Sequence, residues 1–285
     1  MLYKYFKIDE YSISNLIRDE FYCQNYKAFN DPFECWFIIN EGIPNPLKET
    51  ERFEMICNAW GFHPNINDES IEDFNLYMEE LESYQPDVKK YIEGARISCF
   101  SKEQNNLLMW SHYADGLRGF CIEYDEDLLL SIEKDKEVAL IDVNYEKRVP
   151  VVDKMLYSLA NDQIWYHEMA LEEEPKSKFK RDYLKALKEA NKLLENLYQK
   201  TIATKPVQWK YEKETRLIFY SKNVSGEFYK YPPNAIKSVF FGERMRKKDI
   251  DTLLKIFESK DIVVDKKIAH RNNCSYDILF KPIYL

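Results

Sequence analysis

The segment that decides the predicted fold is Trp209-Lys210-Tyr211-Glu212-Lys213-Glu214-Thr215-Arg216-Leu217-Ile218-Phe219. We predict a strand here, and in an extended chain residues two positions apart point to the same face. Glu212, Glu214 and Arg216 would then share one face, while the apolar residues lie on the other. Such a face is either a functional site or an exposed strand surface on which glutamates pair with basic side chains.

The composition is that of a globular protein. Of the 285 residues, 45% are hydrophobic, 32% are charged and only seven are glycine, which excludes collagen-like, low-complexity and largely disordered classes. Acidic side chains outnumber basic ones by 49 to 41, and the net charge of −8 opposes bulk binding to nucleic acid or to an anionic membrane. No signal-peptide pattern and no apolar run of about 20 residues is seen. Six scattered cysteines lack zinc-site spacing. We expect a cytosolic protein with reduced thiols and no membrane partner.

The hydrophobic pattern predicts a single α+β domain over residues 1–285, with a mixed or split β-sheet and helical insertions at about 47–94 and 153–203. Predicted strands cover 2–8, 96–101, 117–124, 138–145, 209–219, 227–231, 236–241, 262–269 and 276–282, and predicted helices include 12–22, 106–114, 178–199 and 247–258. Strands near both ends, with helices gathered between them, distinguish this layout from a repeating βαβ unit.

Paired carboxylates suggest one chemistry for the deciding segment. Glu212 and Glu214 could stabilise positive charge that develops on a sugar carbon, or could orient ribose hydroxyls. Arg216 would keep the nearer glutamate ionised. The structural alternative is a solvated strand face, on which such pairs contribute little stability.

Two further segments fit both a helix start and a ligand site. Ser101 and Gln104 match a capping box for the helix at 106–114, whereas the functional interpretation places the Ser101 hydroxyl against a ligand. Asp31 and Glu34, on either side of Pro32, also match a helix start. In the alternative interpretation, Asp31 and Glu34, with Asn30, supply oxygen ligands to a divalent cation.

His112 and Arg118 are polar candidates beside an apolar helix. His112 lies one position off the apolar stripe and is the candidate for acid/base chemistry, with a structural histidine as the alternative. Arg118 could grip a phosphate or carboxylate, or could be a surface arginine at a hairpin corner. Gly119 after it would permit close backbone approach. No Walker loop and no GxGxxG, GxSxG, HExxH or kinase signature is present.

Eight short segments occur in a characteristic order along the chain. They are Leu2-Tyr3-Lys4-Tyr5, Phe29-Asn30-Asp31-Pro32-Phe33-Glu34, Cys99-Phe100-Ser101, Leu108-Met109-Trp110-Ser111-His112-Tyr113-Ala114-Asp115, Arg118-Gly119-Phe120, Lys205 with Trp209, Tyr211-Glu212-Lys213-Glu214-Thr215-Arg216, and Phe241-Gly242. In this order they resemble the bacterial family known as domain of unknown function 2971. The resemblance extends over the whole length and implies a soluble, mostly bacterial and phage-associated protein, with phage defence as one expected role.

A more distant similarity is to ADP-ribosyltransferase-like folds, which carry a His or Arg, an aromatic-Ser/Thr pair and a catalytic Glu on three strands. This chain has Lys4-Tyr5, Phe100-Ser101 and Glu212-x-Glu214 in that order, with lysine in place of the usual first residue. The similarity implies NAD binding, with Glu214 bonding the ribose as nicotinamide leaves. The predicted catalytic residues are Glu214, Glu212, Ser101 and His112, and the predicted NAD-binding residues are Lys4, Tyr5, Phe100, Ser101, Trp110, Tyr113, Arg118 and Arg216.

Three functions therefore remain as hypotheses. The first is an enzyme that cleaves NAD and transfers ADP-ribose to a macromolecular acceptor or to water. The second is a metal-dependent nucleic-acid hydrolase that uses carboxylates and a histidine; its candidate residues are Asp31, Glu34, Glu212, Glu214 and His112. The third is a non-catalytic sensor or interaction module in which the same residues only hold the fold.

Overall fold

The computed structural model describes residues 1–83, 88–131, 138–222 and 226–283 and separates into two compact units. The first unit is built from Met1–Glu34, Glu93–Lys147 and Lys205–Leu285, and the second from Cys35–Ile92 and Arg148–Thr204. Each unit is therefore assembled from segments that are far apart in the sequence.

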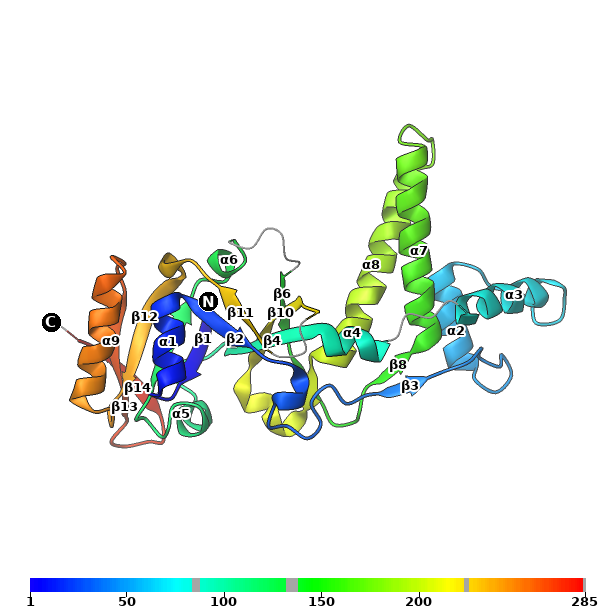
Figure 1. Ribbon diagram of the computed structural model, residues 1–285. Coiled ribbons are helices and arrows are strands. Elements are labelled where there is room, and N and C mark those ends of the chain that lie inside the picture. Colours follow the sequence, from blue (N-terminus) through cyan, green and yellow to red (C-terminus); the bar gives the residue numbers. More distant parts are fainter. Residues whose placement is uncertain (84–87, 132–137, 223–225, 284–285) are drawn as a thin grey trace. The chain divides into compact units, whose positions relative to one another are not determined.

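The first unit contains an eight-stranded mixed sheet (Figure 1). Its strands, in spatial order, are β14 (Ile278–Pro282), β13 (Asp265–Arg271), β12 (Ile236–Gly242), β5 (Phe120–Tyr124), β1 (Leu2–Phe6), β4 (Ala95–Ser101), β10 (Glu214–Tyr220) and β6 (Val138–Asp142). All neighbours in this order are antiparallel except β12 and β13, which are parallel. The predicted α+β class with a mixed sheet is confirmed.

Short elements and helices complete the first unit. They are α1 (Glu10–Arg18), β2 (Glu20–Cys23), η1 (Tyr26–Ala28), α5 (Leu107–His112), α6 (Glu126–Leu129), β7 (Asn144–Glu146), η2 (Val207–Glu212), β11 (Glu227–Lys230), η3 (Pro233–Ala235) and α9 (Lys247–Ser259). Strands β2 and β11 form a separate antiparallel pair. The three-residue strand β9 (Thr204–Pro206) brings the chain back into this unit.

The sheet separates beside its central strand β1. Strand β1 pairs with β5 over five residues, but the described register between β1 and β4 consists of one pair, Tyr3 opposite Ser101. Strand β4 continues instead along β10, where Ser101 lies opposite Glu214. Tyr3, Ser101 and Glu214 are therefore aligned across three adjacent strands, at the place where β1 and β4 separate.

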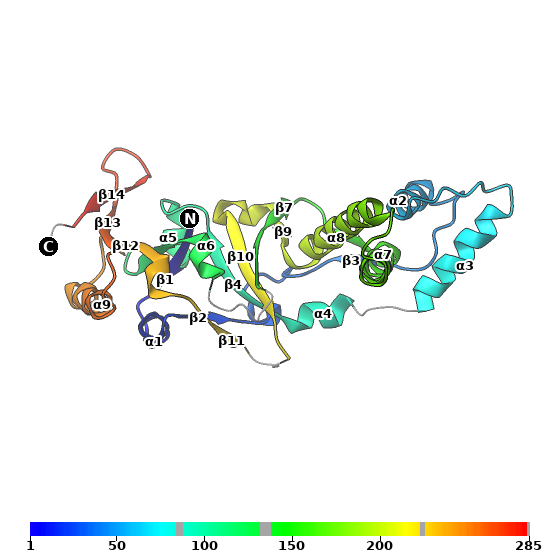
Figure 2. The same cartoon turned by 90° about the horizontal axis from the view of Figure 1, so that it is seen from above.

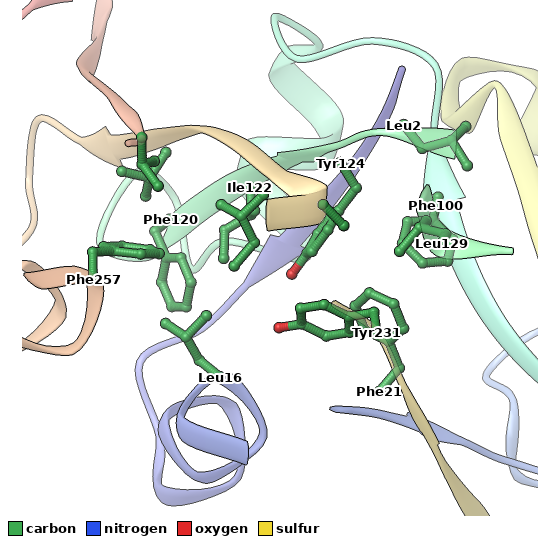
Figure 3. Close-up of a cluster of buried hydrophobic side chains, with 14 of the residues drawn as sticks. Leu2, Leu16, Phe21, Phe100, Phe120, Ile122, Tyr124, Leu129, Tyr231 and Phe257 are labelled. Atoms are coloured by element: carbon green, nitrogen blue, oxygen red, sulfur yellow. The ribbon is translucent and has the colours of Figure 1, made fainter. Parts of the chain in front are cut away.

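One face of the sheet carries the main hydrophobic core, covered by α1 and α9 (Figure 2). Because side chains alternate along a strand, Phe120, Ile122 and Tyr124 of β5 all point to this face. In Figure 3 they lie beside Leu16 of α1 and Phe257 of α9. These side chains are at most 3% exposed, so this core holds both helices against the sheet.

The opposite face carries a smaller cluster under α5. Trp110 is fully buried there, packs edge-on against Tyr5 with ring centroids 5.4 Å apart, and donates its indole N–H to the carbonyl of Gln104. Cys121 and Phe240, from alternate positions of β5 and β12, join this cluster. Both faces of the sheet are thus covered, and α5 is fixed beside β1.

The second unit is mainly helical. Its elements are β3 (Ile38–Asn40), α2 (Thr50–Trp60), α3 (Ser70–Ser83), the start of α4 (Val88–Gly94), β8 (Val151–Asp153), α7 (Lys154–Glu173) and α8 (Lys180–Ile202). Helices α7 and α8 run side by side as a hairpin (Figure 1). Asp153 caps α7 and forms a 2.5 Å ion pair with buried Arg52 of α2. Within the described residues, no helix has the length and apolar character needed to cross a membrane.

Backbone geometry corrects two predicted boundaries. The helix expected over 12–22 ends at Arg18, because Asp19 adopts a left-handed conformation with φ of 54°, and the next residues form β2. The strand expected over 117–124 begins only at Phe120, since Leu117 also has a positive φ of 67°. Asp115 and Gly116 also have positive φ, so the expected Asp-Gly turn is present and extends through Leu117. The turn at Asp19 contains no glycine that could have signalled it.

The predicted close approach at Gly119 is present. A Cβ atom at this position would lie 2.0 Å from the carbonyl oxygen of Phe6 and 3.1 Å from the backbone of Ala114. Both neighbours are backbone, which cannot rotate away. Glycine is therefore required where α5 leads into β5.

We predict that Gly119→Ala lowers the free energy of unfolding by about 1–3 kcal/mol, the usual cost of forcing extra volume into a packed site. Urea denaturation followed by tryptophan fluorescence measures the change. Gly94→Ala is the matched control, because the nearest atom to its new Cβ would be 3.7 Å away. Equal stability of the two variants would contradict the prediction.

Candidate functional site

A cavity of about 340 Å³ lies where β1 and β4 separate, and every described residue that lines it belongs to the first unit. The lining residues are Tyr3, Lys4, Tyr5, Tyr22, Gln24, Ala28, Phe29, Asn30, Ile97, Ser98, Cys99, Phe100, Ser101, Met109, Tyr113, Lys205, Glu212 and Glu214. Tyr3, Ser101 and Glu214, which are aligned across the sheet, are all among them. Segments remote in sequence therefore meet at one concave site.

Seven residues predicted for the site line this cavity: Lys4, Tyr5, Phe100, Ser101, Tyr113, Glu212 and Glu214. Arg216 lies behind Glu214 and is fully buried. Three other candidates lie elsewhere among the described residues. Trp110 is in the core under α5, His112 is exposed with its ring 6.3 Å from that of Tyr211, and exposed Arg118 bonds to the carbonyl of Asp115.

Glu212 corrects the expectation of one continuous strand. It belongs to η2, and Lys213 follows with a left-handed φ of 42° before β10 begins at Glu214. The alternative of a solvated face is also wrong, because Glu212 and Glu214 are each only 3% exposed and Arg216 is fully buried. The glutamates reach one site because the chain turns between them, not because they alternate on a strand.

Side-chain hydrogen bonds hold this turn. The Ser101 hydroxyl donates to the carbonyl of Glu212 at 2.7 Å, and the Asn106 amide donates to the carbonyl of Tyr211 at 2.7 Å. The backbone N–H of Glu214 donates to the Tyr145 hydroxyl at 2.8 Å. The two glutamates are therefore positioned through their backbone as well as through their side chains.

Both predicted helix starts are wrong. Helix α5 is capped by Asn106, whose Oδ1 accepts from the N–H groups of Leu108 and Met109, so Ser101 is free of that role. Residues 31–35 form a turn, in which Asp31 Oδ1 accepts from the N–H of Phe33. This turn places the buried Glu34 carboxylate next to the site.

Arg216 joins two of the buried carboxylates. Its Nε donates to Glu214 Oε1 at 2.9 Å, and its guanidinium lies 2.6 Å from Glu34 Oε1. Burial disfavours the charged guanidinium, but the carboxylates of Glu214 and Glu34 outweigh this and raise the pKa of Arg216. A buried ion is stable only when paired in this way.

Lys205 joins the carboxylates on the cavity side. Its Nζ donates to Glu212 Oε2 at 2.8 Å, lies 2.5 Å from Glu214 Oε2 and lies 3.9 Å from Glu34 Oε2. The Tyr113 hydroxyl completes the cluster by donating to Glu212 Oε1 at 2.5 Å. Three carboxylates thus surround two cations inside the protein.

The glutamates differ in proton affinity. Burial tends to raise the pKa of Glu214, but Arg216 and Lys205 prevail and lower it to about 2. Burial raises the pKa of Glu212 above its ordinary value, even though Lys205 opposes the shift. Glu214 is therefore a fixed negative charge at neutral pH, and Glu212 is the more easily protonated of the two.

Lys4 supplies a different kind of cation at the cavity. Its Nζ donates to Ser98 Oγ at 2.9 Å and to the carbonyl of Cys99 at 2.8 Å, and lies 4.9 Å from the ring centre of Phe100. Burial lowers the pKa of Lys4. In contrast to Lys205, its nearest hydrogen-bond partners are neutral groups.

The carboxylates predicted as metal ligands have other partners in the structure. Glu34 pairs with Arg216 and lies near Lys205, and Asp31 bonds to the backbone of its own turn. Within the described ranges, no three His, Cys, Asp or Glu side chains are grouped so that they could hold a metal ion. The carboxylates at the site therefore belong to an ion-pair network with Lys205 and Arg216.

The sequence analysis did not predict that Lys205 and Glu34 take part in the ion-pair network. Lys205 was noted only as part of the family resemblance, and Glu34 only as a possible metal ligand or helix residue. Their burial could not be deduced from the pattern, because lysine and glutamate are usually exposed. One sequence feature could have indicated their role. The segments that resemble the family contain several acidic residues, and if these were buried together they would need cations close by.

We predict that Glu214→Gln weakens the acid sensitivity of the fold. A pKa of about 2 in the folded state, against 4.5 ordinarily, stabilises the fold above about pH 4.5, and this stabilisation disappears as the pH falls toward 2. Its size is on the order of 3 kcal/mol. Glu214→Gln should be less stable at pH 7 but lose less stability between pH 5 and pH 3.

Chemical denaturation of both proteins across this pH range measures the effect. Glu258→Gln, a change at an exposed residue of α9, is the control and should follow the wild type. Parallel curves for wild type and Glu214→Gln would show that Glu214 is not held ionised in the folded protein.

Comparison with known proteins identifies a family but no characterised relative. No curated protein and no solved structure matches the chain significantly. The family model described as "Protein of unknown function (DUF2971)" matches residues 109–217, a segment that contains Tyr113, Lys205, Glu212, Glu214 and Arg216. This match supports the predicted resemblance to the DUF2971 family over residues 109–217.

Proposed function

We propose that the cavity binds NAD and that the protein breaks the bond between nicotinamide and ribose, passing ADP-ribose to a macromolecular acceptor or to water. The observation that carries the proposal is the alignment of Tyr3, Ser101 and Glu214 on three adjacent strands around one cavity. Of the three motifs of the ADP-ribosyltransferase-like resemblance, Lys4-Tyr5 lies on β1 and Phe100-Ser101 on β4, and the third ends at Glu214, the first residue of β10. Their convergence supports the proposal independently of the residue types.

The reaction needs a negative charge close to the ribose. When the C1′–N bond breaks, its electron pair leaves with nicotinamide and positive charge develops on the ribose. Glu214 is ionised at neutral pH, buried and at the cavity wall. A fixed carboxylate in a water-poor site stabilises such a charge far better than solvent does.

Glu214 also has room for a substrate hydroxyl. A carboxylate offers about four lone-pair positions. The Arg216 Nε bonds Oε1, the Lys205 ammonium lies near Oε2, and the Cys99 thiol is a third hydrogen-bond partner of this carboxylate. About one lone-pair position then remains, and a ribose hydroxyl could bond there without displacing either cation.

The cavity suits the nicotinamide and its ribose in size and surface. About 340 Å³ is at the lower end of the range of roughly 300–1,000 Å³ usual for ligand pockets. Aromatic and apolar side chains from Tyr3, Tyr5, Phe29 and Met109 form part of its wall and suit a flat pyridine ring. The rest of the dinucleotide would extend beyond the cavity.

The acceptor completes the reaction. Its nucleophilic atom forms a new bond to C1′ of the ribose, and its proton passes to water.

The predicted metal-dependent hydrolysis has less support, because Glu34, Glu212 and Glu214 are already paired with Lys205 and Arg216. A bound divalent cation would have to displace them.

We predict that purified protein releases nicotinamide from NAD and that Glu214→Gln lowers the rate at least about 100-fold, as expected for loss of a transition-state charge contact. Chromatographic detection of nicotinamide, with and without cell extract as a source of acceptor, measures the rate. Glu258→Gln is the control and should retain the wild-type rate.

Circular dichroism of each variant separates loss of activity from loss of the fold. Tyr113→Phe is a gentler second variant, because it removes one hydrogen bond to Glu212 and keeps the ring. We expect it to fold and to slow release about 10-fold. A folded Glu214→Gln protein with the wild-type rate would refute the proposal.

A further inference from the structure

Lys205 lies at the site, but neither the family match nor the proposed reaction assigns it a role. It lies in β9, nine positions before β10 begins, and its side chain is only 6% exposed. Its ammonium forms the short contacts with Glu212 and Glu214 described above. No other described lysine contacts two buried carboxylates in this way.

We propose that Lys205 is a positioning residue that holds the carboxylates of Glu212 and Glu214 side by side and keeps both of them charged. The effect of Lys205 on catalysis rests on the proposed function. The electrostatic part concerns the unliganded protein and can be tested without NAD.

The charge balance requires such a cation. Two carboxylates that share a buried site repel each other, and one of them normally takes up a proton. Arg216 contacts Glu214 and Glu34. Among the described residues, the Glu212 carboxylate accepts hydrogen bonds from Tyr113, a neutral donor, and from Lys205. Lys205 is therefore the cation that balances Glu212.

The surroundings of Lys205 fit a permanently charged ammonium. Burial alone lowers its pKa, but Glu214 and Glu212 raise it above the ordinary lysine value. The ring of Trp209 lies 5.6 Å from Nζ, close enough for a cation–π contact. Lys4 differs, since burial lowers its pKa and its partners are neutral. The two lysines at the cavity thus have different functions.

The groups that affect the titration of Glu212 come from four elements and from the turn after α5. They are Lys205 of β9, Glu214 of β10, Tyr145 of β7, Tyr211 of η2 and Tyr113. The tyrosines have pKa values raised by burial and stay neutral in the physiological range. Removal of the Lys205 charge would consequently leave Glu212 facing one carboxylate and neutral groups.

The decisive experiment follows Glu212 by carbon-13 NMR of protein labelled at the glutamate carboxyl carbon. Glu212→Gln assigns the resonance by its disappearance. We expect Lys205→Met to shift the Glu212 titration upward by at least one pH unit, a tenfold change in proton affinity. Lys205→Arg should shift it by less. Lys210→Met, a change of an exposed lysine in the same segment, should leave it unchanged.

A wild-type measurement covers the possibility that Lys205→Met does not fold. In protein labelled at the lysine Cε, the Lys205 resonance should move at the pH at which Glu212 titrates, and that of Lys210 should not. An unmoved Lys205 resonance, or the same Glu212 titration in wild type and Lys205→Met, would overturn the proposal.

Kinetics with NAD test the catalytic consequence. Lys205→Met should lower kcat about 100-fold and change KM by less than threefold, and its rate should rise with pH over a range where the wild type is flat. A raised KM with unchanged kcat would instead make Lys205 a substrate contact and overturn the positioning role. If the wild type releases no nicotinamide, the proposed function fails, whereas the NMR result still decides the role of Lys205.

Discussion

The arrangement around the cavity depends on the neutralisation of buried charge. Removing an ion from water costs several kcal/mol, and Glu34, Glu212 and Glu214 are all buried. Arg216 and Lys205 offset this cost only while the turn after η1, β9, η2 and the start of β10 stay together. The ion pairs therefore fix where the turn that carries Glu34 meets the continuous stretch from β9 to the start of β10, in addition to any chemistry they perform.

The separation of β1 from β4 leaves a cavity beside this cluster of charged side chains. If β1 and β4 were paired along their full length, the side chains at their junction would be packed between strands. The described pairing instead consists of Tyr3 and Ser101, and a cavity occupies the space beside it. The Ser101 hydroxyl then connects this junction to the turn that carries Glu212. The backbone topology and the charge network thus depend on the same few residues.

The sequence predicted much of this fold and part of the site. Runs of apolar residues located the central strands, because both faces of the sheet are covered, and Phe120 and Cys121 point to opposite clusters. Ser101 and Glu214 were recognised from their motifs. The turns at Asp19 and Lys213 were missed, because neither contains the glycine that usually marks a positive φ. The turn expected at Asp115 and Gly116 is present, but its extension to Leu117 was not foreseen. Lys205 was missed as a participant because its burial depends on partners that only the tertiary structure brings together.

A crystal structure with a carbocyclic NAD analogue, which cannot lose nicotinamide, tests the central claim most directly. The account predicts the nicotinamide and its adjoining ring between Tyr3, Ser101 and Glu214, with the 2′-hydroxyl in hydrogen-bond contact with the Glu214 carboxylate and Lys205 still paired with Glu212. An analogue bound away from these residues, or a cavity that stays empty at saturating concentration, would contradict it.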